Sequence, residues 1–380
     1  MLRLWYSFEL ARTHKADNKQ NNLPFIAGLF LTMQYPSTIT QQYSEYLLFR
    51  NFYTGHPVEK SQAKEVFSVE EAKTYLEKRL GSLDNAAILL SGGMDSAILL
   101  PYMPKSTVAY TIFHEDLDEE SEVEIARSYC EKFGIEHKVI SINPKDYVDC
   151  IDKLMINKKM PLSPAEPILH LVSKVAIEDG FSQIVTGAGA DQGCGGFSKS
   201  RRDYSISGFQ KRLEKTYVNP SVTLKSHANI HEILKHYTRP ADFIRKTIRN
   251  LPLRLTAKTL VDTRKFFNEI GIERFAYNNA IHLAGGEHIA PLKEIYFNYD
   301  EVKNQKKPKY FIQDIYESIY GKLPPKKLGL QKPAFLLRDY KPSNFDLFRE
   351  DLKTDHLPYN KKFLIYCLER FENLRLNGKV

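Results

Sequence analysis

The sequence predicts an α/β fold in which a parallel sheet with flanking helices is followed by a mainly helical C-terminal half. Between residues 85 and 190, short apolar runs of strand length alternate with helical patterns, which is typical of parallel sheets with helical crossovers. Glycine-rich stretches directly follow two of these runs. Beyond residue 199 the strand signals fade and basic helical patterns replace them.

Three regions follow from this change of character along the chain. Residues 1–80 form an N-terminal region, 81–200 the α/β core, and 201–380 a mainly helical part that completes the same functional unit. The length of 380 residues is enough for two domains.

The elements before and within the core have recognisable limits. An aromatic and leucine-rich face predicts a helix over 43–53, and Ser68 with Glu71 forms a capping box for a helix that Gly81 closes. Strands are expected at Ala86–Leu90, Val108–Phe113, Glu136–Ser141 and Gln183–Thr186.

The helices between these strands are marked by prolines, acidic residues and glycines. Pro101 and Pro104 cut the first one short. Acidic residues from Glu115 open the next, which runs to Phe133 with Gly134 after it, and a third helix covers about 168–178. In the C-terminal half, helical patterns cover Ala241–Asn250 and Thr256–Ile270.

Composition limits the classes of protein that the chain can belong to. The hydrophobic fraction is 42%, and the four cysteines form no Cys-x-x-Cys pair, so neither a zinc site nor a disulfide framework is indicated. We expect neither a signal peptide nor a membrane span, and we expect a cytoplasmic protein.

The net charge of +8 is concentrated in one segment. Lys199 to Lys265 holds 16 Lys and Arg residues against 5 Asp and Glu residues. Such a segment can bind RNA, an acidic substrate or an acidic partner, but it is more often a solvated helical face. Nucleic acid is therefore not the expected partner.

The first glycine-rich stretch is Ser91-Gly-Gly-Met-Asp-Ser96, between an apolar run and a helix start. Strand, glycine turn and helix together present backbone N–H groups to a phosphate. Asp95 would repel a phosphate unless it holds a Mg²⁺ that bridges to it. The alternative interpretation is an ordinary glycine turn.

The second stretch, Gly187 to Phe197, begins 96 residues after Ser91 and also follows a short strand. Its Asp191 is placed to be a second metal-binding carboxylate. Two carboxylates at the ends of neighbouring strands could hold Mg²⁺ on a leaving pyrophosphate. A helix cap is the alternative role for Asp191.

Together these motifs resemble the pyrophosphate loop of the PP-loop ATP pyrophosphatases and, within them, the synthetase domain of asparagine synthetase. The acidic stretch Glu119 to Glu124, the segment Gly286 to Leu292 and Lys309-Tyr-Phe-Ile-Gln resemble further stretches of that family. The resemblance covers roughly 42–340.

The resemblance implies ATP and Mg²⁺ as cofactors and an ATP-dependent carbon–nitrogen ligase that forms an amide through an acyl-adenylate. It implies metal ligation by Asp95 and Asp191 and catalytic roles for Lys309 and Lys332. The alternative interpretation of Lys309 is a surface lysine in a lysine-rich run. The substrate would be a small-molecule or peptide carboxylate. The nucleotide-binding residues that it implies are Leu90, Ser91, Gly92, Gly93, Asp95, Ser96, Phe113, Gly187, Ala188 and Gly189.

Several positions depart from the family pattern. Leu2 stands where the family's glutaminase nucleophile would be, so we expect a separate glutaminase or another amine source. Ala188 and Gln192 replace residues that are usually acidic, and Ile289 replaces an arginine. These changes put asparagine in doubt as the product.

Three other functions stay open at this stage. One is a PP-loop cyclase or lactam synthetase, in which the amine belongs to the substrate. Another is a PP-loop tRNA-modifying enzyme, which the basic segment favours and the missing Cys-x-x-Cys disfavours. The last is an inactive nucleotide-binding homologue, which Ala188 and Gln192 would explain.

Overall fold

The structure of the chain is a computed structural model. The residues that it describes lie within one compact unit, Ser37–Val380. They are 38–51, 64–113, 120–193, 205–235, 238–240, 259–261, 272–297, 309–323 and 334–380.

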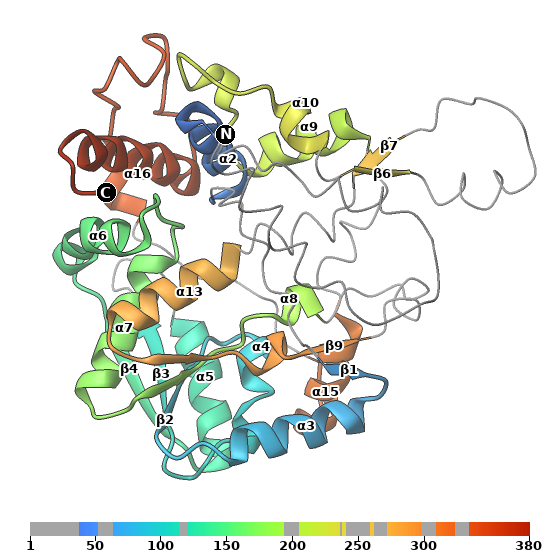
Figure 1. The fold of residues 1–380 in the computed structure, drawn as a ribbon. Coiled ribbons are helices and arrows are strands. Elements are labelled where there is room, and N and C mark those ends of the chain that lie inside the picture. The colour runs from blue at the N-terminus through green and yellow to red at the C-terminus, as the bar shows by residue number, and fades with distance from the viewer. Residues whose placement is uncertain are drawn as a thin grey trace, which may run out of the picture. The chain divides into compact units, whose positions relative to one another are not determined.

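The centre of this unit is a five-stranded sheet in which every pair of neighbours is parallel (Figure 1). Its strands are, in spatial order, β4 (Glu136–Ser141), β3 (Val108–Phe113), β2 (Ala86–Leu89), β5 (Gln183–Val185) and β8 (Glu287–Ile289). The chain builds outward from β2 to β4 and then returns to the other side of β2. The order therefore reverses between β2 and β5, the kind of position at which open α/β sheets bind ligands.

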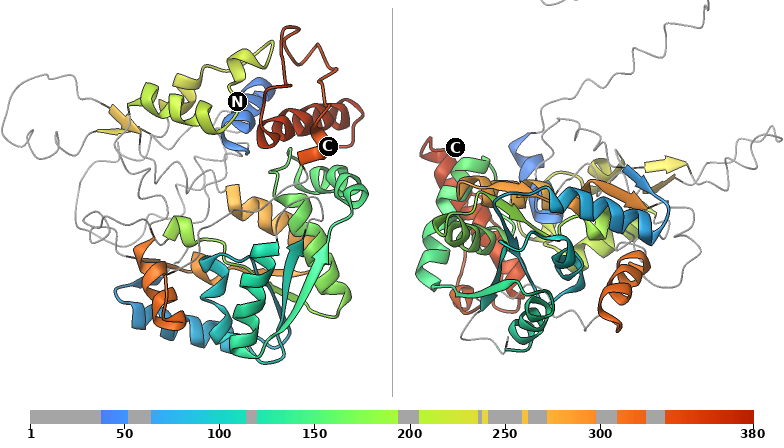
Figure 2. Two further views of the ribbon diagram at one scale, coloured as in Figure 1. Left: turned by 180° about the vertical axis from the view of Figure 1, so that it is seen from behind. Right: turned by 90° about the horizontal axis from the view of Figure 1, so that it is seen from below.

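Alternate side chains of the strands pack into two separate hydrophobic layers, because successive residues of a strand point to opposite faces. Ile88, Ala109 and Val185 belong to one layer, with α3 (Val69–Gly81), α5 (Glu120–Phe133) and α15 (Tyr310–Tyr320). Ala87, Val108 and Ile184 belong to the other, with α7 (Glu166–Glu178) and α13 (Ile272–Leu283). The sheet is thus covered on both faces (Figures 1 and 2).

The remaining helices extend the unit beyond the sheet. A further hydrophobic cluster joins α2 (Ile39–Phe49) to α6 (Pro144–Lys158) and α16 (Tyr359–Leu376). The described residues also form the helices α4 (Met94–Ala97), α8 (Ala190–Gly193), α9 (Ile206–Thr216) and α10 (Ile230–Lys235) and the 3₁₀ turns η1 (Leu100–Tyr102), η3 (Pro220–Val222), η5 (Pro291–Lys293) and η6 (Ala334–Leu337).

Two small sheets complete the strands. In one, β1 (Lys64–Val66) pairs in parallel with β9 (Ile295–Phe297). In the other, β6 (Thr238–Pro240) pairs antiparallel with β7 (Thr259–Val261).

The predicted fold class is confirmed, and so are several local signals. The Ser68 hydroxyl caps α3 by accepting a hydrogen bond from the Glu71 N–H at 3.1 Å. Pro101 falls in η1, which follows the single turn of α4. Gly134 follows α5 with a φ of 63°, as a left-handed helix terminus requires.

Other expectations were incomplete or wrong. The helix predicted over 256–270 contains β7, where Thr259 and Val261 supply the β-branched side chains that suit a strand. Strand β8, which lies in the half expected to be mainly helical, joins the main sheet. The helix predicted at 241–250 lies outside the described residues.

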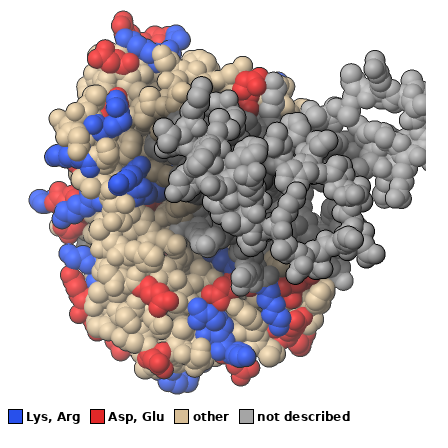
Figure 3. Space-filling view, in the orientation of Figure 1, with Lys and Arg blue, Asp and Glu red and all other residues tan. Residues whose placement is uncertain are grey.

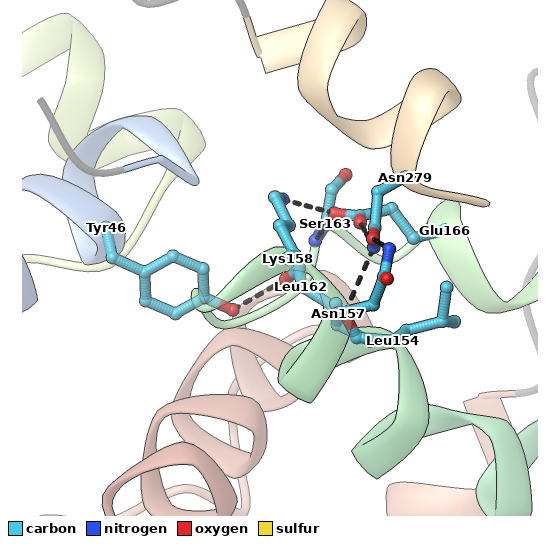
Figure 4. Close-up of polar contacts among 8 residues, drawn as sticks. All are labelled: Tyr46, Leu154, Asn157, Lys158, Leu162, Ser163, Glu166 and Asn279. Carbon is cyan, nitrogen blue, oxygen red and sulfur yellow. Dashed lines mark hydrogen bonds and ion pairs between the residues drawn. The ribbon is translucent and has the colours of Figure 1, made fainter. Parts of the chain in front are cut away.

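A buried polar cluster fixes α13 against α6 and α7 (Figure 4). The Glu166 carboxylate is fully buried and accepts hydrogen bonds from Lys158 Nζ at 2.7 Å, the Ser163 N–H at 2.6 Å and Asn279 Nδ2 at 3.0 Å. Because each oxygen of this carboxylate is paired, the cluster can stabilise the arrangement of the helices that cover the sheet.

The surface shows no large area of a single charge sign on the face drawn in Figure 3, where basic and acidic side chains are interspersed over the described residues. Much of the basic segment 199–265 lies outside those residues. No helix in the part of the chain that the structure describes is long and apolar enough to cross a membrane.

Candidate functional site

The two aspartates singled out by the sequence follow neighbouring strands. Asp95 lies in α4, just after β2, and Asp191 lies in α8, just after β5. Strands β2 and β5 are parallel partners, with Ile88 opposite Val185. Both aspartates therefore lie at the carboxyl edge of the sheet, where the strand order reverses.

The first loop is held in shape by its own serines and by α5. The Ser91 N–H donates to Ser96 Oγ at 3.3 Å, and the Gly93 N–H donates to Ser91 Oγ at 3.4 Å. A Cβ atom on Gly92 would lie 3.0 Å from the backbone oxygen of Glu122. Glycine suits this position because α5 leaves little room for a side chain.

The second loop touches the first directly. A Cβ atom on Gly187 would lie 2.7 Å from the backbone carbon of Asp95 and 2.8 Å from the Ser96 nitrogen. Since backbone atoms cannot move aside as a flexible side chain can, only glycine fits there. Gly189 has a φ of 103° and packs against Lys293. These two glycines let the two aspartate-bearing turns lie side by side.

Lys309 joins the two aspartates. Its Nζ atom lies 2.7 Å from Asp95 Oδ2 and 2.8 Å from Asp191 Oδ1. The lysine side chain is 9% exposed, and those of Asp95 and Asp191 are 20% and 32% exposed. Burial lowers the pKa of Lys309, but the two carboxylates raise it by more, so its pKa lies above its ordinary value and the ammonium is charged at neutral pH.

The backbone places this ammonium with some strain. Lys309 has a φ of 54° and occupies the N-cap position of α15, where its side chain makes no capping hydrogen bond. A left-handed conformation costs a residue with a Cβ atom about 1–2 kcal/mol. The paired side chain compensates for such strain, which is common at functional sites.

Three tyrosines connect α15 to the first loop and to α4. Tyr320 donates to the Ala97 carbonyl at 2.8 Å, and the hydroxyls of Tyr129 and Tyr316 lie 2.9 Å apart. The Tyr129 hydroxyl also donates to the Gly92 carbonyl at 3.4 Å. Hydrogen bonds therefore link α15 to the first loop, through Tyr129 of α5, and to the helix that carries Asp95.

A polar chain from α13 orients the second loop. His288 Nδ1 lies 2.7 Å from Asn278 Oδ1, an atom that can only accept, so the histidine proton is on Nδ1. His288 Nε2 then accepts from the Thr186 hydroxyl at 2.8 Å, and that oxygen accepts from the Ala188 N–H at 3.4 Å. Burial, with Lys293 and His282 nearby, lowers the pKa of His288 to about 3 and keeps the ring neutral.

The sequence did not identify His288 or Lys293 as residues of this region. His288 lies in the Gly286-to-Leu292 segment, and Lys293 follows it directly. The resemblance of this segment to the family is weak on its own. Lys293 Nζ lies 5.7 Å from the ring centre of Tyr277, which stacks on His288. No sequence signal marked His288, because the pairing of β5 with β8, which places His288 opposite Ile184 and on the same face as Thr186, was not expected.

The other implied nucleotide-binding residues differ in burial and in position. Leu90 is buried, and its carbonyl accepts from Thr111 Oγ1 at 2.8 Å. Phe113 is half-buried at the carboxyl end of β3, and Ala188 is buried within the second loop. Lys332 lies outside the described residues. Whether these residues bind nucleotide stays a prediction.

The site fits a magnesium ion better than a metal that needs a full protein cage. Among the described residues, no group of three or more His, Cys, Asp and Glu side chains could hold a metal. Mg²⁺ is commonly bound by one or two carboxylates together with phosphates of the substrate. One cation, the Lys309 ammonium, already reaches oxygens of both aspartates, so their spacing suits a shared cation.

The fold and these loops define a member of the asparagine synthase family. The family model for asparagine synthase matches residues 73–292, more than half of the chain, and the chain belongs to this family. Strands β2, β3, β4, β5 and β8 and both loops lie within the matched residues.

Curated relatives match over shorter stretches. A putative glutamine-hydrolysing asparagine synthetase of Methanocaldococcus jannaschii is 26% identical over 167 residues, which are 39% of this chain and 29% of that protein. Glutamine-hydrolysing asparagine synthetase 1 of Bacillus subtilis is 28% identical over 125 residues, 32% of this chain and 20% of that protein. The chain thus spans less than a third of either relative.

Solved structures resemble the chain only loosely. The U34-tRNA thiolase NcsA from Methanococcus maripaludis with its [4Fe-4S] cluster has a TM-score of 0.29 at 14% identity, with 82% of each chain covered. A predicted subunit of tRNA methyltransferase from Methanocaldococcus jannaschii has a TM-score of 0.21 at 19% identity and covers 47% of this chain and 96% of its own.

Proposed function

We propose that this chain is an ATP-dependent ligase that activates a carboxylate as its acyl-adenylate and releases pyrophosphate, after which an amine displaces AMP to form an amide. The observation that carries the proposal is the contact of Asp95, Asp191 and Lys309 where the strand order reverses. Membership of the asparagine synthase family supports it.

The first loop would bind the phosphates that leave. N–H groups in the first turn of a helix have no acceptor within the helix, so those at the start of α4 can donate to pyrophosphate oxygens. Gly92 leaves the first loop without a side chain where α5 approaches it, and Gly187 does the same for the second loop where it meets the first. Asp95 and Asp191 would hold Mg²⁺, which neutralises charge on the pyrophosphate.

Lys309 would act at the phosphorus that is attacked. In the first step a carboxylate oxygen forms a bond to the α phosphorus while the bond from that phosphorus to the bridging oxygen of the β phosphate breaks. The Lys309 ammonium, charged and largely shielded from water, can stabilise the negative charge that spreads over these oxygens. In the second step, the amine attacks the acyl carbon and AMP departs.

The experiment that tests this function is carboxylate-dependent exchange of labelled pyrophosphate into ATP. We would screen aspartate, other amino acids and small peptides, including substrates whose own amine could close a ring. Exchange with any of them, abolished by Asp95→Asn, supports the proposal. Turnover of ATP labelled at the α phosphate must then give AMP; label in ADP would refute it.

The amine donor and the acyl group remain part of the proposal. We infer that free ammonia from a separate glutaminase, or an amine on the substrate itself, completes the reaction. Adding each amine to the adenylating mixture and following amide formation by mass spectrometry distinguishes an amidotransferase from a cyclase.

A further inference from the structure

The Lys309 ammonium stands where a divalent cation would bind. Its Nζ atom is within 2.8 Å of one oxygen from each aspartate, so it bridges the two carboxylates as a shared metal would. Its stem is buried with it, since the side chain is only 9% exposed. The same two oxygens therefore have two possible cationic partners.

The burial of one Asp95 oxygen determines whether Lys309 and a metal ion can contact this carboxylate at the same time. Its second oxygen, Oδ1, is buried from solvent, whereas Oδ2 is the oxygen that Lys309 contacts. Mg²⁺ gives up its water reluctantly and needs near-octahedral geometry. A hydrated ion that is shared by both aspartates must therefore use Asp95 Oδ2, the atom that the ammonium already contacts.

The position of Lys309 in the chain allows its side chain to change partners. Lys309 precedes the first residue of α15, whereas Tyr316 and Tyr320 anchor the later turns of that helix. The long side chain can rotate while the helix stays in place. A polyphosphate beside the loop would offer the ammonium charged oxygens that can replace the two carboxylates as acceptors.

We propose that Lys309 holds the place of the divalent cation between Asp95 and Asp191, and that this pair takes up Mg²⁺ only together with a polyphosphate that accepts the ammonium. Free metal then binds the site only weakly, and metal and nucleotide bind together. The inference rests on the proposed function only in naming the polyphosphate as ATP.

The test uses Mn²⁺ as a spectroscopic probe, with free ion measured by electron paramagnetic resonance. Wild-type protein should bind Mn²⁺ weakly alone and far more tightly with α,β-methylene-ATP, which cannot be cleaved between those phosphates. Lys309→Met and Lys309→Gln should bind Mn²⁺ alone about tenfold more tightly, or better, because a competing charge is gone. Adding Asp95→Asn to Lys309→Met should abolish that gain.

The matched control is Lys309→Arg, which keeps the charge and should leave Mn²⁺ binding weak. Mn²⁺ should also raise the Tm of Lys309→Met but not that of the wild type, because a ligand stabilises the folded state it binds. Equal Mn²⁺ affinity in the wild type and in both uncharged variants would overturn the proposal. No turnover is involved, so failure of pyrophosphate exchange leaves this result interpretable on its own.

A measurement on the wild type covers the case in which the uncharged variants do not fold. Modification of Lys309 by an amine-reactive reagent, followed by mass spectrometry, should be slow and unchanged by millimolar Mg²⁺ alone. If Mg²⁺ alone exposes Lys309 to the reagent, metal displaces the ammonium without a nucleotide, and the proposal is wrong.

Discussion

Acid should destabilise this protein through His288, and the size of the effect follows from its surroundings. The ring is neutral in the fold because burial and the charges of Lys293 and His282 lower its pKa from 6.5 to about 3. Its two hydrogen bonds, to Asn278 at 2.7 Å and Thr186 at 2.8 Å, also use the neutral form. Protonation of Nε2 would remove the acceptor that the Thr186 hydroxyl needs.

The direction of the pH dependence follows from the lowered pKa. Between about pH 3 and 6.5 the unfolded chain binds the proton and the folded chain does not. The contribution to stability is therefore complete above pH 6.5 and falls as the pH drops toward 3. From pH 6.5 to about pH 4.5 the loss is roughly 2 kcal/mol of unfolding free energy.

The measurement is urea unfolding at a series of pH values for the wild type, His288→Gln and the matched control His356→Gln, which replaces an exposed histidine. Other groups titrate in this range, including the buried His170, whose pKa burial also lowers. Only the difference between curves is therefore informative. His288→Gln should lose roughly 2 kcal/mol of the pH dependence that the control keeps. Parallel curves for all three proteins would refute the reasoning.

Three further predictions concern the loops and helices around the site. Gly187→Ala should abolish pyrophosphate exchange, because its Cβ would lie 2.7 Å from backbone, whereas Gly81→Ala, with nothing within 4 Å, should leave exchange intact; equal activity of both variants would contradict this. Tyr320→Phe should lower the free energy of unfolding by about 1 kcal/mol through loss of its hydrogen bond, as measured in urea, and reduce kcat; an unchanged kcat would separate this helix from the site. Glu166→Gln should destabilise by about 3–5 kcal/mol, because the buried Lys158 ammonium loses its charged partner; a Tm within a degree of the wild type would refute it.

The sequence was most informative where local chemistry decides the structure. Ser68 and Pro101 mark a helix start and a helix stop through hydrogen bonding and ring geometry alone, and both are confirmed. The alternation of apolar runs with helices predicted the parallel sheet. These signals depend on neighbours within a few residues, which is why sequence reasoning reaches them.

Features that depend on distant residues were harder to predict. Strand β8 is only three residues long and begins with the exposed Glu287, so it lacks the apolar run of a central strand. For the candidate site, the sequence indicated Asp95, Asp191 and Lys309, but not that one ammonium bridges both carboxylates. The role of His288 depends on Asn278 and Thr186, which only the packing of α13 on the sheet brings together.

The bridging ammonium also has a consequence for how the molecule is made. The ribosome releases Asp95 and Asp191 well before Lys309, so the growing chain brings two carboxylates to one edge of the sheet before their shared counter-ion exists. Like charges in such proximity oppose the final approach of the two loops. Docking of α15 removes that opposition, and the nascent protein should therefore close its site only after this helix has left the exit tunnel. Fragments that end before residue 309 should accordingly stay open at this edge.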